Sequence, residues 1–257
     1  MLADLYPLMP PADLILENRI GAEPNTDILF RFDEIGRGIA GEMIRDGFLR
    51  ADHSVLDVGC GLGRVARALA EFLEPPGSYC GIDVVKSSID WCAEHYSRID
   101  NFRFVWADLY SAHYNPDATI RAREYRFPLD DRSVDRIIST SLFTHLVPED
   151  ADHYIAEMAR VLKPGGQMWN TFCLLDAVST PLAICHPSIP MPISIPHGRV
   201  AHAGDHEALV GLDVAFVVEA HVRHGLEIAD IRNGAWSGRK DDVRASYQDV
   251  VIARKPG

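Results

Sequence analysis

Short apolar runs alternate with segments of helical periodicity along most of the chain, and this alternation constrains the fold more than any other feature. Each apolar run is bounded by Gly, Pro, Asp or Ser, as a buried strand would be. The runs predicted as strands are 54–58, 78–82, 102–107, 133–139 and 167–174. The predicted helices are 33–48, 62–73, one capped by Ser87 or Ser88, and 151–162. The pattern predicts an α/β fold, a doubly wound, Rossmann-like, mostly parallel sheet with helices on both faces.

The 257 residues suit a single domain made of four segments. Residues 1–32 are rich in proline and are expected to form an N-terminal lid segment, and residues 33–175 form the core. Residues 176–213 contain five prolines and four histidines, and we expect an irregular cap insertion over the carboxyl edge of the sheet. Residues 214–257 are expected to supply a C-terminal helix and a strand pair, at 214–225, 226–231 and 247–253.

The acidic composition limits the partners of the protein. Lys and Arg number 25 and Asp and Glu number 37, which gives a formal net charge of −12 at pH 7. This charge disfavours binding through bulk attraction to nucleic acid or an anionic membrane. No apolar run approaches the roughly 18 residues of a membrane span, and the N-terminus lacks the basic flank of a signal peptide. We expect a cytoplasmic protein that binds a small molecule, with no nucleic acid and no membrane as partner; its oligomeric state stays open, and a homodimer is one alternative.

The cysteines and histidines give no metal site. The five cysteines are odd in number and none forms a Cys-x-x-Cys pair, which favours free thiols in a reducing compartment. His202 and His206 have a spacing that would place two ligands on one helical face, but Gly204 and the upstream Pro196 disfavour a helix there. The sequence therefore predicts no metal.

A glycine-rich loop follows the first predicted strand. Gly59, Gly61 and Gly63 lie in the segment 55–64, whose sequence is Val-Leu-Asp-Val-Gly-Cys-Gly-Leu-Gly-Arg. Glycine permits a sharp turn and a close approach of a ligand to the backbone. The helix that follows offers unpaired N–H groups suited to a carboxylate or a phosphate. The alternative interpretation is a tight strand–helix turn that binds nothing.

Two acidic residues end the next two predicted strands. Asp83 lies 24 residues beyond Gly59, where a carboxylate can accept both hydroxyls of a ribose. Asp108 follows the third strand and can accept a hydrogen bond from an adenine amino group, while Leu109 packs on the ring. Because ligands in such sheets bind at the carboxyl ends of the strands, the acids and the glycine loop together indicate a nucleoside-binding site.

These residues resemble the class I S-adenosylmethionine-dependent methyltransferases of small-molecule type. The resemblance covers roughly residues 33–175 and the C-terminal strand pair. Its motifs are Leu-Asp-Val-Gly-Cys-Gly-Leu-Gly at 56–63, Gly-Ile-Asp at 81–83, Ala-Asp-Leu at 107–109, Phe-Pro-Leu-Asp-Asp at 127–131, Ser-Val-Asp-Arg-Ile-Ile at 133–138 and Arg-Val-Leu-Lys-Pro-Gly-Gly at 160–166. The resemblance implies a seven-stranded sheet with a reversed last strand, for which 247–252 is the candidate.

The resemblance also implies the cofactor, S-adenosylmethionine, with S-adenosylhomocysteine as the product. Asp57 and the backbone around Gly59 and Gly61 would hold its methionine part. Asp83 would hold the ribose, and Asp108 with Leu109 the adenine. The further cofactor contacts expected are Cys60, Gly63, Val84 and, beside the sulfonium, Ser139 and Thr140. A narrower resemblance, to methyltransferases of saccharide, glycolipid or secondary-metabolite pathways, rests on Ser-Leu-Phe-Thr-His-Leu at 141–146, Trp-Ser-Gly-Arg at 236–239 and Gln-Asp at 248–249.

His145 is the candidate catalytic base. Methyl transfer from a sulfonium is an in-line displacement in which the protein mainly positions the nucleophile, and a base helps when the acceptor is a hydroxyl. His145 follows the fourth predicted strand and titrates near neutral pH. Its alternative role is to buttress the following helix. Asn170 and Asp176 are further candidates for orienting a hydroxyl, and Arg239 for meeting an anionic acceptor.

Three functions remain open. The first is a methyltransferase that moves a methyl group to a small-molecule acceptor, at an oxygen of a sugar, glycolipid or secondary metabolite. The second is an NAD(P)-dependent oxidoreductase, because such enzymes also combine a glycine loop with a ribose-binding acid. The third is a non-catalytic subunit that binds S-adenosylmethionine. Asp57 before the glycines and the Lys-Pro-Gly-Gly turn at 163–166 favour the first.

Overall fold

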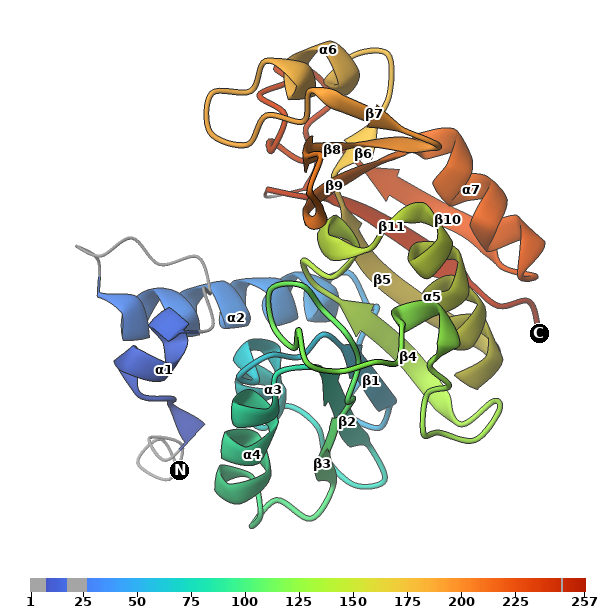
Figure 1. Ribbon diagram of the computed structural model, residues 1–257. Coiled ribbons are helices and arrows are strands. Elements are labelled where there is room, and N and C mark those ends of the chain that lie inside the picture. The colour runs from blue at the N-terminus through green and yellow to red at the C-terminus, as the bar shows by residue number, and fades with distance from the viewer. Residues whose placement is uncertain (1–7, 18–26, 246) are drawn as a thin grey trace. The chain divides into compact units, whose positions relative to one another are not determined.

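The computed structural model describes residues 8–17, 27–245 and 247–257. Its strands form a seven-stranded sheet in the order β10-β11-β5-β4-β1-β2-β3 and a four-stranded sheet in the order β6-β9-β8-β7 (Figure 1). The pairs β1–β2, β2–β3 and β4–β5 are parallel, whereas β11 is antiparallel to β5. The structure therefore confirms the predicted α/β fold with its mostly parallel sheet and reversed last strand.

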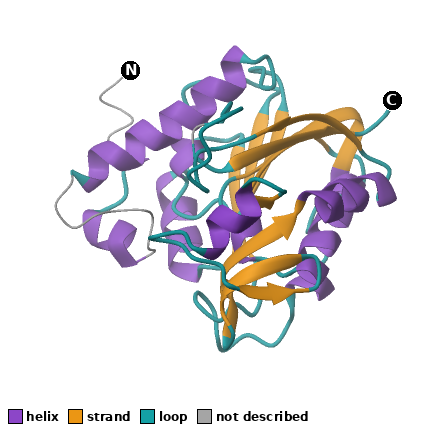
Figure 2. Ribbon diagram, turned by 90° about the horizontal axis from the view of Figure 1, so that it is seen from above, coloured by secondary structure: helices purple, strands orange, loops and turns teal. Residues whose placement is uncertain are grey.

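The chain divides into two compact units, of which the first ends at Asp108 and the second begins at Leu109. The prediction of a single domain with a lid and a cap stays a prediction, and half of the 1–32 segment lies outside the described residues. The helices and strands of the first unit, coloured by type in Figure 2, are α1 (Ala12–Glu17), α2 (Ile28–Arg45), β1 (Ser54–Val58), α3 (Arg64–Leu69), β2 (Ser78–Asp83), α4 (Lys86–His95) and β3 (Phe102–Trp106).

Local capping explains where the helices of the first unit begin. The α2 helix starts earlier than predicted because the Asp27 side chain accepts a hydrogen bond from the backbone N–H of Phe30, at 3.1 Å. The predicted Ser87 or Ser88 cap is wrong. The α4 helix begins at Lys86 after Val85, and Ser88 is buried inside it.

The second unit contains the other strands of the seven-stranded sheet, the whole four-stranded sheet, and the remaining helices. Its elements are η2 (Ala122–Glu124), β4 (Val134–Ser139), η3 (Phe143–His145), α5 (Pro148–Val161), β5 (Leu162–Phe172), β6 (Leu174–Leu175), α6 (Ser179–Ile184), β7 (Ile193–Ile195), β8 (Gly198–His202), β9 (Asp205–Asp213), α7 (Val214–Arg223), β10 (Glu227–Arg232) and β11 (Asp249–Arg254). The β9 strand packs against η3, so the small sheet lies against the segment that follows β4.

The Lys-Pro-Gly-Gly segment at 163–166 is part of a strand, which corrects the predicted turn. Val134 of β4 pairs with Leu162, but Arg136 pairs with Gln167, so the four residues between them bulge out of the β4–β5 ladder. Gly165 adopts φ +76°, and its N–H donates to the Lys255 carbonyl at 2.9 Å. The glycines thus allow β5 to begin early while the bulge pairs with the chain after β11.

The proline-rich region 176–213 is regular, contrary to the prediction of an irregular cap. It forms α6 and the strands β7 to β9, with an antiparallel β8–β9 hairpin in which His202 pairs with Asp205. The small sheet covers an apolar cluster of Cys173, Leu175, Ala183, Met191 and Trp236. The prolines hid this pattern because they stand beside the short strands rather than within a long alternating run.

The buried carboxylate of Asp249 links the segment between β10 and β11 to this cluster. Asp249 accepts hydrogen bonds from the indole Nε1 of Trp236 at 2.6 Å, from the N–H of Gly234 at 2.6 Å and from the N–H of Leu174 at 2.7 Å. Burial raises the pKa of Asp249, although these donors oppose the shift. Trp236 therefore has a structural role, as a hydrogen-bonded member of the apolar cluster.

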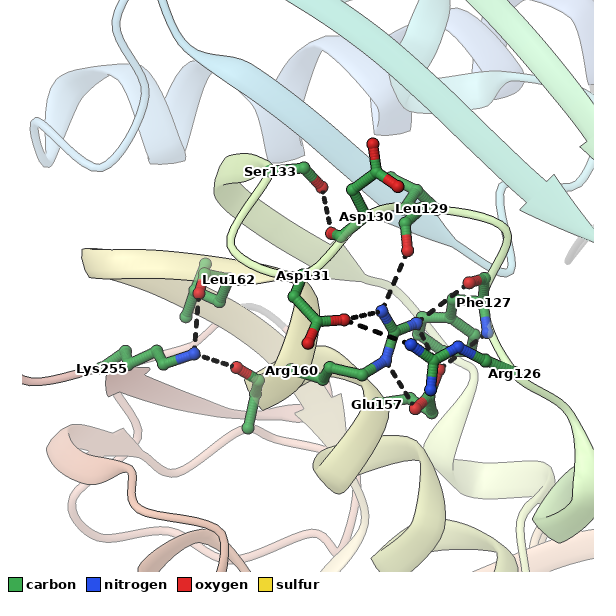
Figure 3. Close-up of polar contacts among 11 residues, drawn as sticks. Arg126, Phe127, Leu129, Asp130, Asp131, Ser133, Glu157, Arg160, Leu162 and Lys255 are labelled. Atoms are coloured by element: carbon green, nitrogen blue, oxygen red, sulfur yellow. Dashed lines mark hydrogen bonds and ion pairs between the residues drawn. The ribbon is translucent and has the colours of Figure 1, made fainter.

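Arg160 ties α5 to the loop that enters β4 (Figure 3). Its guanidinium donates to both carboxylate oxygens of Glu157 at 2.8 and 2.7 Å, and to the carbonyls of Phe127 and Leu129 at 3.0 and 2.9 Å. It also pairs with Asp131 at 2.7 Å. The Arg160 side chain is 14% exposed and that of Glu157 is 10% exposed, so replacing the arginine leaves a buried charge unpaired.

We expect Arg160→Leu to lower the free energy of unfolding by about 3 kcal/mol, because it removes one partner of a buried ion pair. Arg126→Leu is the matched control. Arg126 also pairs with Asp131, but its side chain is 71% exposed, so a change below about 0.5 kcal/mol is expected. Urea denaturation of the three proteins measures both effects. Equal losses in the two variants would contradict this assignment.

Candidate functional site

In the first unit, the Asp83 carboxylate holds the glycine loop. Its Oδ2 accepts a hydrogen bond from the N–H of Gly61 at 2.7 Å, and its Oδ1 accepts one from the N–H of Val85 at 2.8 Å. Asp83 is the last residue of β2 and remains partly exposed. Because each carboxylate oxygen can accept a second hydrogen bond, Asp83 retains acceptor capacity for a ligand's hydroxyl groups.

The glycine loop leaves open space beside its backbone. Gly59, Gly61 and Gly63 have φ values of +79°, +51° and +74°, in the left-handed region that disfavours other residues. A Cβ built on Gly61 would meet no atom within 4 Å. The backbone is therefore exposed to a ligand at Gly61.

Asp57 is a buried carboxylate with one unpartnered oxygen. Its Oδ2 accepts a hydrogen bond from the Tyr79 hydroxyl at 2.7 Å, while its Oδ1 has no partner among the described residues. Burial raises the pKa of Asp57 to about 7, against the Tyr79 hydrogen bond, which lowers it. An orphaned buried acceptor suits a cationic donor such as an ammonium group.

The other predicted cofactor residues fall in both units. Cys60 is buried, its Sγ lies 3.7 Å from the Gly61 carbonyl, and burial raises the pKa of its thiol. The Val84 carbonyl accepts a hydrogen bond from Trp106 at 3.1 Å. Asp108 is exposed beyond the end of β3, and Leu109 is buried at the start of the second unit.

In the second unit, the orientation of His145 is fixed by a backbone carbonyl. Its Nδ1 lies 2.8 Å from the carbonyl oxygen of Glu207 in β9. A carbonyl can only accept, so Nδ1 carries the proton in the neutral ring and Nε2 presents its lone pair. Burial lowers the pKa of His145, opposed by the hydrogen bond to Glu207. The imidazole is therefore neutral and basic at Nε2 near neutral pH.

The segment before η2 also contacts this histidine. Tyr114 lies edge-on to the His145 ring, with centroids 6.1 Å apart. Next to it, His113 Nε2 lies 2.8 Å from an Asp205 oxygen, at ion-pair distance but without hydrogen-bond alignment. The N–H of Ala112 donates to the Glu207 carboxylate at 3.0 Å. The β8–β9 hairpin thus holds both this segment and His145.

The remaining polar candidates already have partners. The Ser139 hydroxyl donates to Asn170 Oδ1 at 2.9 Å, and both side chains are fully buried. Arg239 is paired with Asp176 at 2.7 Å. Thr140, the residue after β4, is partly exposed. These hydrogen bonds give Asn170 and Arg239 structural partners within the second unit.

Across the described ranges, no three His, Cys, Asp or Glu side chains are grouped as metal ligands would be. The same ranges contain no helix with the length and apolar character needed to cross a membrane.

Comparison with known proteins gives the family. Residues 55–166 match the family model described as a methyltransferase domain. A fatty-acid O-methyltransferase from Mycolicibacterium smegmatis is 33% identical over 117 residues, which cover 46% of this chain and 36% of the relative. A phthiotriol/phenolphthiotriol dimycocerosates methyltransferase from Mycobacterium ulcerans is 27% identical over 162 residues, which cover 63% of this chain and 49% of the relative. The chain spans half or less of the length of these relatives.

A solved structure shares the fold. The 1,6-didemethyltoxoflavin-N1-methyltransferase from Burkholderia thailandensis, with bound 1,6-didemethyltoxoflavin and S-adenosylhomocysteine, aligns with a TM-score of 0.58 at 17% identity, covering 100% of this chain and 89% of that one. Residues 55–166 therefore form a methyltransferase domain, and the fold of the chain is that of this S-adenosylhomocysteine-bound methyltransferase. This confirms the family, fold and cofactor predicted from the sequence, and gives no support to the nicotinamide-dependent alternative.

The geometry of the first unit is suited to binding S-adenosylmethionine. The orphaned Asp57 oxygen suits the ammonium group, the open backbone at Gly61 permits close approach, and the partly exposed Asp83 suits ribose hydroxyls. The sequence did not indicate that Tyr79 contacts Asp57, because its pattern is that of any core residue of a strand. Nor did the sequence indicate Glu207, because a backbone carbonyl has no sequence signal.

The pKa of Asp57 predicts a pH-dependent affinity for S-adenosylhomocysteine. Below about pH 7 the free protein holds Asp57 protonated, and binding an ammonium group requires that proton to leave. We expect the affinity to rise about tenfold between about pH 6 and about pH 8, measured by calorimetry. Asp57→Asn should bind more weakly and without this dependence.

Tyr79→Phe provides the internal check on that result. It removes the hydrogen bond that lowers the pKa of Asp57, so the midpoint of the pH dependence should move to higher pH. The contact between Asp57 and the ammonium group would be ruled out if the wild-type affinity were constant over this pH range and Asp57→Asn bound S-adenosylhomocysteine as tightly as the wild type.

Proposed function

We propose that the protein transfers the methyl group of S-adenosylmethionine to a hydroxyl oxygen of a small, largely apolar molecule. The observation that carries this proposal is His145, whose Nδ1 proton is engaged by the Glu207 carbonyl so that Nε2 is left as a base. A base accelerates methylation of a hydroxyl, typically by about 10² to 10⁴-fold, whereas an ionised carboxylate needs none.

The names of the relatives support the acceptor class. One is named a fatty-acid O-methyltransferase and another a phthiotriol/phenolphthiotriol dimycocerosates methyltransferase. Both names describe lipid-like molecules with oxygen atoms, in line with an apolar acceptor. A sugar, one of the three acceptor classes expected from the sequence, has no counterpart in these two names.

Each unit has a part in the proposed reaction. Asp57, the Gly59 to Gly63 loop and Asp83 would bind S-adenosylmethionine, with Asp108 and Leu109 at its adenine and Ser139 and Thr140 toward its sulfonium. The bound cofactor supplies a methyl group activated by the positive sulfur. His145 Nε2 would accept the acceptor's hydroxyl proton, and the Glu207 carbonyl would stabilise the resulting imidazolium through its Nδ1–H.

The test combines binding with turnover. Calorimetry with S-adenosylhomocysteine and NAD measures cofactor binding, and mass spectrometry detects methyl transfer to long-chain alcohols, phenols, palmitate and a simple sugar. Binding of S-adenosylhomocysteine with methylation of alcohols or phenols is the expected result. Methylation of palmitate alone would overturn the hydroxyl assignment. Cofactor binding with no methylation of any acceptor would favour the non-catalytic subunit.

We expect His145→Gln to lower kcat on a hydroxyl acceptor by about 100-fold or more, because the proton acceptor is lost. Affinity for S-adenosylhomocysteine should not change. The control is His153→Gln, since His153 also bonds a backbone carbonyl, that of Tyr125, but on α5. In the wild type, the rate should fall as pH drops through the lowered pKa of His145. Undiminished turnover in His145→Gln would remove it as the base.

A further inference from the structure

Three polar side chains gather at the carboxyl ends of β4 and β5. Ser141 lies two residues beyond β4, Thr171 is the penultimate residue of β5, and Gln248 directly precedes β11, whose Asp249 pairs with Phe172. Because β4 and β5 are parallel, this is the edge where α/β sheets bind ligands. His145 leaves the same edge four residues after Ser141.

The hydrogen bonds define which way the Gln248 amide faces. Its Oε1 accepts from the Thr171 hydroxyl at 2.7 Å and from the Ser141 hydroxyl at 3.1 Å. The Thr171 oxygen in turn accepts from the N–H of Ser141 at 2.7 Å, so its own proton is the one given to Gln248. In this orientation of the amide, both lone pairs of Oε1 are occupied by the two hydroxyl groups, and Nε2 lies on the opposite side.

The Nε2 group of Gln248 is therefore left with two N–H donors. Neither has a partner among the residues that the structure describes, and the side chain is partly buried. Its backbone is held in place by the next residue, Asp249, which is bonded to Trp236, Gly234 and Leu174 in the core. A fixed side chain thus presents donors only.

The backbone at Ser141 adopts a strained conformation that lets its N–H and its hydroxyl reach Thr171 and Gln248. Ser141 has φ +62°, a conformation that side chains other than glycine adopt at a cost of about 1 kcal/mol or more. The conformation is held by the bond from its N–H to Thr171 and by the Thr144 hydroxyl, which donates to the Ser141 carbonyl at 3.0 Å. Such strain is found where a segment must present groups to a ligand.

We propose that Gln248 is a specificity-determining contact for the acceptor, donating its amide N–H groups to a second oxygen of that molecule. The inference rests on the proposed function and adds to it the chemistry of the acceptor. A donor-only group binds a carbonyl, carboxylate or ether oxygen and gives nothing to an alkyl group or an ammonium. The preferred acceptor is therefore a hydroxyl compound with a second, hydrogen-bond-accepting oxygen nearby, and a 3-hydroxy ester serves as the test compound of this kind.

The test compares two acceptors that differ in that oxygen, methyl 3-hydroxyhexadecanoate and 2-hexadecanol. The wild type should favour the ester in kcat/KM. Gln248→Met should raise the KM for the ester by about tenfold with kcat little changed, and should leave the alcohol unaffected, because only uniform binding is lost. Gln248→Glu keeps acceptors for Ser141 and Thr171 but replaces the donors with a negative oxygen, and should raise the KM further.

Gln167→Glu is the matched control. This variant makes the same charge change on β5, but at the other end of the strand, where Gln167 pairs with Arg254. It should leave the KM and kcat for both acceptors unchanged. Equal KM values for the ester in the wild type, Gln248→Met and Gln248→Glu, with all proteins folded by circular dichroism, would overturn the inference and make Gln248 a solvated structural residue.

A second readout separates this inference from the proposed function. The side-chain amide ¹⁵N–¹H signals of Gln248 can be assigned by their loss in Gln248→Met. With S-adenosylhomocysteine present, they should shift on addition of the hydroxy ester and not of 2-hexadecanol. If the wild type methylates neither of these compounds nor the alcohols and phenols of the first test, the proposed function fails, while the amide signals still decide the contact. Methylation of the ester with unmoved amide signals would refute the Gln248 contact alone.

Discussion

The hydrogen bond from the Gly61 N–H to Asp83 is the interaction on which the glycine loop of the first unit depends. It joins the loop after β1 to the end of β2, so that one carboxylate both shapes the glycine turn and remains available to a ligand. Asp57 complements it from within β1, where burial leaves one oxygen without a donor. Unpaired buried acceptors destabilise a folded chain, and a ligand that supplies the missing donor converts this cost into affinity.

The second unit orients the His145 ring and the Gln248 amide through neutral hydrogen-bond partners. The Glu207 carbonyl from β9 fixes the His145 ring, and two hydroxyls fix the Gln248 amide. Neutral partners of this kind set a tautomer or an amide orientation while leaving the opposite side of the group free. The small sheet therefore has a direct part in the proposed chemistry, because its strand β9 supplies the carbonyl that orients His145.

Much of the fold follows from local patterns. The strands at 54–58 and 78–83 lie almost where apolar runs predict them, since a buried parallel strand reads as a continuous apolar segment. Asp57 within β1 and Asp83 at the end of β2 could be placed along with these strands. Two predictions failed because long-range pairing prevailed. The glycines at 163–166 extend β5 through contacts with the chain near Lys255, and the prolines at 176–213 flank strands that pair only in the folded protein.

The sequence by itself determined the class of fold, the family and the kind of cofactor, because these depend on residue types repeated at fixed spacing along a sheet edge. Only the tertiary structure decided which of those residues have spare hydrogen-bonding capacity. Ser139 and Asn170 bond each other, whereas Asp57 Oδ1 and Gln248 Nε2 have no partner within the described part of the chain. Whether a polar atom has a hydrogen-bond partner depends on residues that are distant in the chain, so it is decided only when the segments pack together.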